Sequence, residues 1–161
     1  MNIPTYLPFH VFCGIVFRCL KRRQKKMDKK HITVCAGVID YQGKILIAQR
    51  RRDKSLGGLW EFPGGKIEAG ETHEQTLTRE IREEFDIAIQ VGKFLTQITH
   101  EYPNFILTMY VYQAHWDGQG TIRICDHEEY RFVNLEEIDG FEMPAADKPV
   151  LAFLKEHRNE L

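Results

Sequence analysis

Two runs of apolar, β-branched residues begin the regularly patterned part of this chain. They cover residues 32–39 and 44–49, and their composition is typical of strands. Asp40, Tyr41, Gln42 and Gly43 lie between them, and a glycine at this point suits the tight turn of a hairpin. The pattern therefore predicts two antiparallel strands joined by a short turn.

The next pattern has the period of a helix and follows Gly70, Glu71 and Thr72. Apolar residues recur near helical spacing and should form the buried stripe; they are Ala69, Leu77, Ile81 and Phe85. We expect the helix to start at residues 70–72 and to bury this stripe against the sheet.

The rest of the chain again reads mainly as strands. We expect long strands at residues 87–99 and 104–116, with a turn at 102–104, and further strands at 121–124 and 130–133 after a turn at 117–120. Residues 147–160 have an amphipathic pattern that tolerates Pro149 in a first helical turn. This order predicts an α/β fold in which helices enclose a mixed sheet.

Three carboxylates share one face of the predicted central helix. Glu80 and Glu83 are three residues apart, and Glu80 and Glu84 are four apart. Like charges at this spacing repel by about a few tenths of a kcal/mol per pair, so a bound cation would compensate them. A solvated acidic surface is the common alternative for such a pattern in isolation.

The wider spacing distinguishes these two interpretations. The chain reads G-x5-E-x7-R-E-I-x-E-E, which fixes Gly65, Glu71, Arg79, Glu80, Glu83 and Glu84. With residue frequencies of about 7%, these six matches arise by chance roughly once in 10^7 positions. The pattern resembles the Nudix box of the Nudix hydrolases. Asp86 stands where that family usually has glycine, and Asp tolerates the left-handed conformation of a helix C-cap.

The resemblance implies an α/β/α sandwich and a metal-dependent cleavage of a diphosphate linked to another group. It implies Mg2+, or Mn2+, as the cofactor. The backbone carbonyl of Gly64 and the carboxylate of Glu84 would be metal ligands, with Glu80 and Glu83 completing the set. The three glutamates are also the acids best placed to act as the catalytic base that orients the attacking water. Arg79 would hold a glutamate in position by an ion pair.

A further acid from a distant loop is usual in the family, in a Glu-His pair before a strand. Asp126 and His127 occupy the matching position, so Asp126 would act as a ligand or base, with Glu128 and Glu129 as adjacent substitutes. His127 alone is more typical of a structural histidine than of a catalytic one.

Residues 47–50, 59–68 and 144–150 extend the resemblance to the MutT branch and its relatives, which hydrolyse CTP and oxidised nucleotides. This implies a set of substrate-binding residues: Arg50, Glu61, Phe62, Pro63, Gly64 and Asp147. The guanidinium of Arg50 suits bidentate contact with phosphate. Tyr102 and Phe105 would either stack on the base or belong to the core.

Asp147 lies where MutT proteins carry an asparagine that reads 8-oxoguanine. An ionised aspartate accepts hydrogen bonds but donates none, whereas an amide does both. We therefore expect a base edge that presents donors, such as an exocyclic amine. This favours cytidine-type or broader specificity over strict 8-oxo-dGTP sanitation.

Charge is distributed unevenly along the 161 residues. Residues 1–26 hold six basic residues and no acid, whereas residues 27–161 hold 16 basic and 23 acidic residues, a net charge of about −7. Such a domain repels polyphosphates and nucleic acids, so an anionic substrate requires metal ions and local arginines. We expect no direct nucleic-acid binding.

Residues 1–26 differ from the domain expected at residues 27–161. The apolar run is too short to span a membrane, and its basic residues follow it rather than precede it. It would be a weak membrane-surface anchor, a partner-binding tail or an extension absent from the working protein, and we favour the extension. Mass spectrometry of the native N-terminus would decide. The four cysteines form no metal or disulfide pattern, so we expect a cytoplasmic protein.

Together these features predict a Mg2+-dependent nucleoside triphosphate pyrophosphohydrolase that forms a nucleoside monophosphate and pyrophosphate. CTP, dCTP derivatives and oxidised nucleotides such as 8-oxo-dGTP are the expected substrates. The alternatives are a catalytically silent nucleotide-binding regulator, a Nudix hydrolase of sugar nucleotides or dinucleoside polyphosphates, and a membrane-surface protein dominated by its N-terminal segment. We expect a monomer or homodimer without membrane association.

Overall fold

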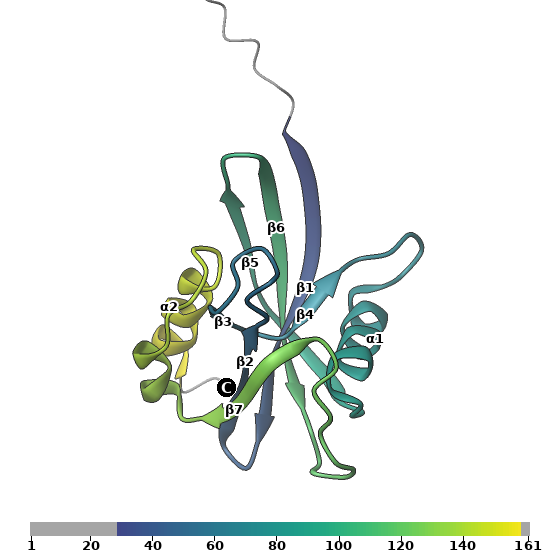
Figure 1. Ribbon diagram of the computed structural model, residues 1–161. Coiled ribbons are helices and arrows are strands. Elements are labelled where there is room, and N and C mark those ends of the chain that lie inside the picture. The colour runs from purple at the N-terminus through teal and green to yellow at the C-terminus, as the bar shows by residue number, and fades with distance from the viewer. Residues whose placement is uncertain (1–28, 159–161) are drawn as a thin grey trace, which may run out of the picture.

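The computed structural model describes residues 29–158, which form one mixed β-sheet with helices on both faces (Figure 1). The predictions for residues 1–26 lie outside the described residues. The elements are β1 (Lys30–Tyr41), β2 (Lys44–Arg50), β3 (Trp60–Glu61), β4 (Gly64–Lys66), α1 (His73–Phe85), β5 (Gln90–Glu101), β6 (Phe105–His115), β7 (His127–Val133), the 3-10 helix η1 (Leu135–Gly140) and α2 (Lys148–Glu156).

The sheet has the strand order β3-β2-β1-β6-β5, with β4 added to β1 and β7 added to β2. β1 and β6 are parallel, and the other pairs are antiparallel. Alternate residues of β1 face opposite layers, as the period of two requires. Cys35 and Ile39 pack in the cluster under α1, whereas Ala36 and Val38 pack in the cluster under α2. This confirms the predicted α/β class and the enclosed sheet.

The first hairpin forms at the predicted place. Tyr41 pairs with Lys44, and the two turn residues Gln42 and Gly43 have φ angles of 52° and 75°. Positive φ at both central residues matches the right-handed twist of the strands that a two-residue hairpin joins.

Helix α1 begins with a capping box, in which Thr72 accepts from the backbone of Gln75 and the Gln75 side chain accepts from the backbone of Thr72. Its buried face contains three of the predicted residues, Leu77, Ile81 and Phe85, each fully buried. The prediction for Ala69 is wrong, because the chain is still in the exposed loop before the helix at that residue.

The end of α1 also organises the loop that follows β6. Asp86 adopts the left-handed conformation with φ 56°, as expected for the residue that replaces glycine. The predicted strand at residues 121–124 is wrong. Instead, the backbone N–H groups of Arg123 and Cys125 donate to the carbonyls of Phe85 and Glu84, each at 2.9 Å. Carbonyls in the last turn of a helix lack intrahelical donors, so they bind this segment in place of a neighbouring strand.

Several element boundaries differ from the sequence pattern. β5 begins at Gln90 rather than at residue 87, β7 begins at His127, and α2 ends at Glu156. β3, β4 and η1 were not predicted, because two to six residues carry too little periodicity to identify an element. Within residues 29–158 no helix is long and apolar enough to cross a membrane.

Candidate active site

The glycine loop brings the backbone of β4 against the carboxylate of Glu80. Gly65 pairs with Cys35 of β1, and a Cβ atom on Gly65 would lie 2.2 Å from the carboxyl carbon of Glu80. A Cβ atom on Gly64 would lie 2.1 Å from the carbonyl oxygen of Cys35. Side chains at these two positions would therefore separate the loop from the strand and from the helix that carries the acids.

Arg79 joins the acids of α1 to the loop. Its guanidinium donates to Glu71 at 2.7 Å, to Glu80 at 2.9 Å and to the carbonyl of Lys66 at 3.0 Å. The hydrogen bond from Arg79 is the main reason that the pKa of Glu71 falls to about 2. Glu83 contacts the same guanidinium at 3.4 Å, and its side chain is 61% exposed. Glu71 and Arg79 thus form an ionised clamp that orients Glu80.

Glu84 is the buried acid of the group. Its Oε2 atom is buried and has no hydrogen-bond partner among the described residues. Burial raises the pKa of Glu84 well above its ordinary value, and the nearby charges of Glu61, Glu80 and Asp126 raise it further. A buried acceptor without a donor costs free energy, and a cation beside Glu84 would offset that cost.

The acids of α1 do not form a ready-made metal site. Within residues 29–158, no group of three or more His, Cys, Asp or Glu side chains is arranged to hold a metal ion. Mg2+ is commonly held by one or two carboxylates, with water and substrate phosphates supplying the remaining oxygens. The unpartnered oxygen of Glu84, with the Glu80 carboxylate against β4, matches this type of site.

Asp126 reaches the end of α1 because residues 123–125 are hydrogen bonded to that end. Its carboxylate forms an ion pair with Lys54 from the loop between β2 and β3, and 48% of the side chain is exposed. Its charge still acts on Glu84. The fold thus brings Asp126 close enough for its charge to act on Glu84, and its role as a ligand or base stays a prediction.

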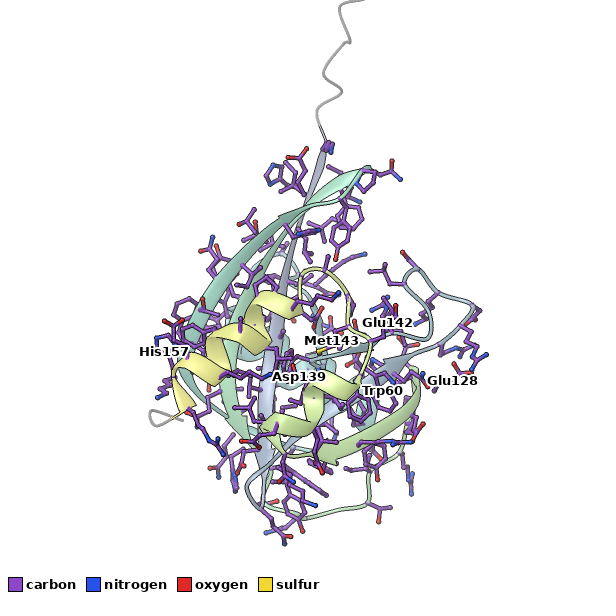
Figure 2. All side chains as sticks on the ribbon, turned by 90° about the vertical axis from the view of Figure 1, so that its left-hand side faces the viewer. Trp60, Glu128, Asp139, Glu142, Met143 and His157 are labelled. Atoms are coloured by element: carbon purple, nitrogen blue, oxygen red, sulfur yellow. The ribbon has the colours of Figure 1, made fainter. Side chains whose placement is uncertain are left out.

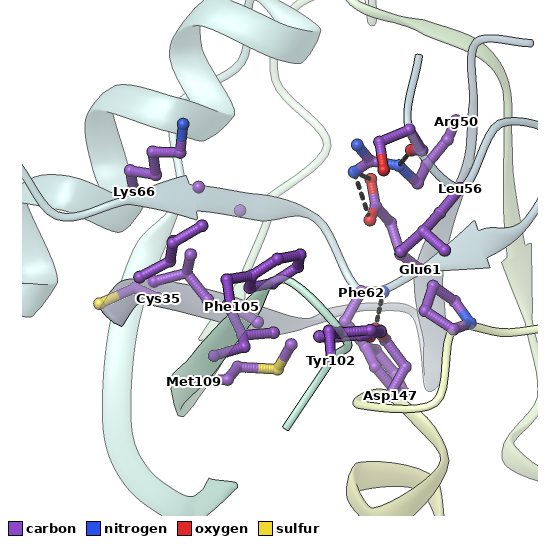
Figure 3. Close-up of a pocket in the computed structure, with 18 residues that line it drawn as sticks. Cys35, Arg50, Leu56, Glu61, Phe62, Lys66, Tyr102, Phe105, Met109 and Asp147 are labelled. Carbon is purple, nitrogen blue, oxygen red and sulfur yellow. Dashed lines mark hydrogen bonds and ion pairs between the residues drawn. The ribbon is translucent and has the colours of Figure 1, made fainter. Parts of the chain in front are cut away.

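Glu61 is fixed by residues from two neighbouring strands. The Arg50 guanidinium contacts both carboxylate oxygens of Glu61 at 2.8 Å, as the dashed lines in Figure 3 mark. His127 contacts one of the same oxygens at 3.1 Å. The sequence pointed to Arg50 and Glu61 but not to their mutual contact, nor to the contact of Glu61 with His127. The isolated His127 in its strand gives no periodic signal of such a contact.

A cavity of about 350 Å³ lies beside these acids and is lined mainly by apolar side chains (Figure 3). Tyr102 and Phe105 stack on each other at its wall, with ring centroids 4.7 Å apart. Phe62 and Asp147 also line it. Pro63 is buried, and its carbonyl accepts a hydrogen bond from Gly37 of β1. The cavity has the size and aromatic surface that suit a nucleobase.

Asp147 is 3% exposed and accepts a hydrogen bond from the backbone N–H of Phe62 at 3.1 Å. Burial, aided by the charge of Glu61, raises the pKa of Asp147 to about 8. Our assumption of an ionised Asp147 is therefore wrong, because burial disfavours the charged form. A protonated carboxyl group donates and accepts like an amide, so it does not select for a base edge that presents only donors.

Comparison with known proteins places this geometry in a family. A sequence model described as NUDIX domain matches residues 34–153. The chain is 36% identical over 122 residues to the CTP pyrophosphohydrolase of Escherichia coli (strain K12), covering 76% of this chain and 90% of that protein. It is 35% identical over 127 residues to the 8-oxo-dGTP diphosphatase of Haemophilus influenzae, covering 78% of this chain and 92% of that protein.

Solved structures agree with these relatives. The solution structure of the E. coli ORF135 protein matches with a TM-score of 0.70 and 34% identity, covering 81% of this chain and 92% of that chain. The crystal structure of the MutT protein from Methanosarcina mazei Go1 matches with a TM-score of 0.71 and 25% identity, covering 83% and 97%. Because the family match covers most of the chain and the fold agrees, this protein is a member of the NUDIX domain family.

Proposed function

We propose that the protein is a divalent-metal-dependent nucleoside triphosphate pyrophosphohydrolase that releases a nucleoside monophosphate and pyrophosphate. One observation carries the proposal: Gly65 and Glu61 border both the aromatic cavity and the acid group. A base in the cavity would thus be joined by its sugar to phosphates at the acids. The relatives named as CTP pyrophosphohydrolase and 8-oxo-dGTP diphosphatase support this reaction class.

Glu84, Glu80 and the carbonyl of Gly64 are the groups that would hold Mg2+ or Mn2+, with Glu83 and Asp126 nearby to complete the set. When bound, such a cation neutralises phosphate charge and lowers the pKa of a coordinated water. The buried Oε2 atom of Glu84 has no hydrogen-bond partner in the part of the chain that the structure describes and so costs free energy in the free protein. In this proposal the same atom is the principal metal ligand.

The surrounding residues prepare the acids and the substrate for reaction. Arg79 fixes Glu80 through contacts that are already formed, so little reorganisation is needed when substrate arrives. Arg50 is 28% exposed at its side chain and would exchange the carboxylate of Glu61 for phosphate oxygens, two of which a planar guanidinium can contact at once, as it does those of a carboxylate. This local positive charge counters the net negative charge of the domain.

The base would lie between the apolar wall and the stacked pair Tyr102 and Phe105, where aromatic stacking favours any base. A protonated Asp147 matches edges with donors and edges with acceptors. This supports CTP, dCTP derivatives and 8-oxo-dGTP as substrates of one site, rather than cytidine nucleotides alone.

The test is pyrophosphate release from CTP, dCTP derivatives and 8-oxo-dGTP by the purified protein with Mg2+. Glu84→Gln should lower kcat at least about 100-fold, the scale for removal of a catalytic contact. Glu74→Gln makes the same chemical change on the exposed first turn of α1 and should leave kcat unchanged. If no nucleotide is hydrolysed in a metal-dependent way, the proposed enzymatic activity is refuted. Nucleotide binding without turnover would instead identify a catalytically silent regulator.

A further inference from the structure

His127 is buried between the end of α1 and Glu61. Its side chain is 3% exposed, and its ring stacks on Phe85, the last residue of α1, with centroids 5.2 Å apart and planes at 14°. Its Nε2 atom lies 3.1 Å from Oε1 of Glu61, while its Nδ1 atom is buried and unpartnered among the described residues. Since an ionised carboxylate only accepts hydrogen bonds, Nε2 is the nitrogen that donates.

Three adjacent strands bring this contact together. Arg50 at the end of β2 pairs with His127 of β7, at a register shift that follows Gln49. Glu61 belongs to β3, on the other side of β2, where it pairs with Ala48. Arg50 and His127 therefore approach one carboxylate from two strands, and His127 contacts an oxygen that Arg50 also contacts.

The two partners of Glu61 differ in their freedom to leave it. The Arg50 side chain is 28% exposed, borders the cavity and, among the described residues, is otherwise held only by a hydrogen bond to the exposed carbonyl of Ser55 at 2.9 Å, whereas the His127 side chain is buried between Phe85 and Glu61. In the proposed function Arg50 turns to the phosphates of the substrate. Without a second donor, Glu61 would follow Arg50 and compete with the phosphates for its guanidinium.

We propose that His127 is a positioning residue that keeps Glu61 in place when Arg50 exchanges this carboxylate for the substrate phosphates. The inference rests on the proposed function for the role of Arg50. It assigns His127 an effect on substrate binding, because a Glu61 carboxylate that competes for Arg50 weakens the phosphate contact equally in the enzyme–substrate complex and in the transition state. Loss of such uniform binding raises KM and leaves kcat nearly unchanged.

The experiment compares variants that differ in reach at this position. His127→Gln replaces the ring N–H with an amide donor of nearly the same reach, so its KM should stay within about threefold of the wild-type value. His127→Asn places its donor one methylene short of Glu61. It should therefore raise KM about tenfold, the scale of one hydrogen bond to a charged group. His127→Leu should resemble His127→Asn. Equal KM values for the Gln and Asn variants would overturn the proposal.

A second histidine provides a matched control. His157 stacks on Phe153 with centroids 4.1 Å apart and planes at 20°, so it makes a similar contact elsewhere in the fold. Figure 2 shows His157 and Glu128, the neighbour of His127, at opposite edges of the molecule. His157→Leu should leave both KM and kcat unchanged. A purely structural effect of His127 would instead lower the active fraction, and hence kcat, at constant KM.

A double-mutant cycle then tests whether His127 acts through Glu61. In a Glu61→Ala background no carboxylate competes for Arg50, so His127→Leu should add less than about a twofold change in KM. Additive effects would overturn the proposal. Wild-type turnover measured in the same assay separates the outcomes, because absent turnover refutes the proposed function, whereas normal turnover with additive effects refutes only the role of His127.

Discussion

Replacing Asp147 by asparagine should stabilise the protein at neutral pH. The folded protein keeps a proton on Asp147, whose pKa is about 8 in the cavity against an ordinary value of 3.8, whereas the unfolded chain releases it. The folded state therefore binds more protons between these two values, and stability falls as pH rises from about 4 to about 8. Asparagine carries no such penalty, and its amide oxygen can accept the hydrogen bond from Phe62.

The size of the effect follows from the linkage. Each unit between the two pKa values corresponds to about 1.4 kcal/mol, so the penalty reaches about 4 kcal/mol near pH 7 and disappears near pH 4. Little discount for solvent is needed, because Asp147 is 3% exposed. Asp147→Asn should thus exceed the wild type in free energy of unfolding by several kcal/mol at pH 7 and match it at acid pH.

Urea unfolding at several pH values measures this difference directly. Asp139→Asn, a change at an exposed aspartate of η1 paired with Lys155, is the control and should stay within about 0.5 kcal/mol of the wild type. Equal differences between the Asp147 variant and the wild type at about pH 4.5 and about pH 8 would refute the reasoning. A variant less stable than the wild type at pH 8 would do the same.

Two further changes test the loop and the acid group. Gly65→Ala should lower kcat at least about tenfold, because its Cβ would displace the Glu80 carboxylate that now lies 2.2 Å from that position; unchanged steady-state kinetics would contradict this packing. Lys54→Gln should shift the Mg2+ titration of activity to about threefold lower concentration, because it releases Asp126 from an exposed ion pair. Asp126→Asn in the same background should remove that gain, and a titration unaffected by Lys54→Gln would show that the pair does not compete with the metal.

Local patterns in the sequence predicted what depends on nearby residues. The acids and apolar residues of α1 follow one helical period. The left-handed cap at Asp86 could be predicted because this residue stands where the Nudix box usually has glycine. Residues 121–124 were misassigned because their strand-like composition says nothing about the free carbonyls of α1 that bind this segment. Ala69 was misassigned because spacing alone did not reveal that the helix begins later.

The parts of the site that were not predicted depend on contacts between distant segments. Glu61 and His127 are 66 residues apart, and their contact requires β3 and β7 to flank β2. The protonation of Asp147 depends on burial by residues from several elements, which residue type alone does not indicate. Single-sequence patterns therefore identified the candidate residues, whereas the tertiary structure was needed to define their charge and partners.

The parallel pairing of β1 with β6 also has a consequence for folding. Lys30 pairs with Phe105, so the ladder joins positions about 75 residues apart and encloses the glycine loop and α1 between its ends. Closing so large a chain segment costs conformational entropy and is therefore slow. The β1–β6 pairing adds little stability until the elements between the two strands have folded. We expect the acids of α1 to reach their final arrangement in the same cooperative step in which β1 and β6 pair. Catalytic activity and protection of the backbone amides from hydrogen exchange should therefore appear together during refolding.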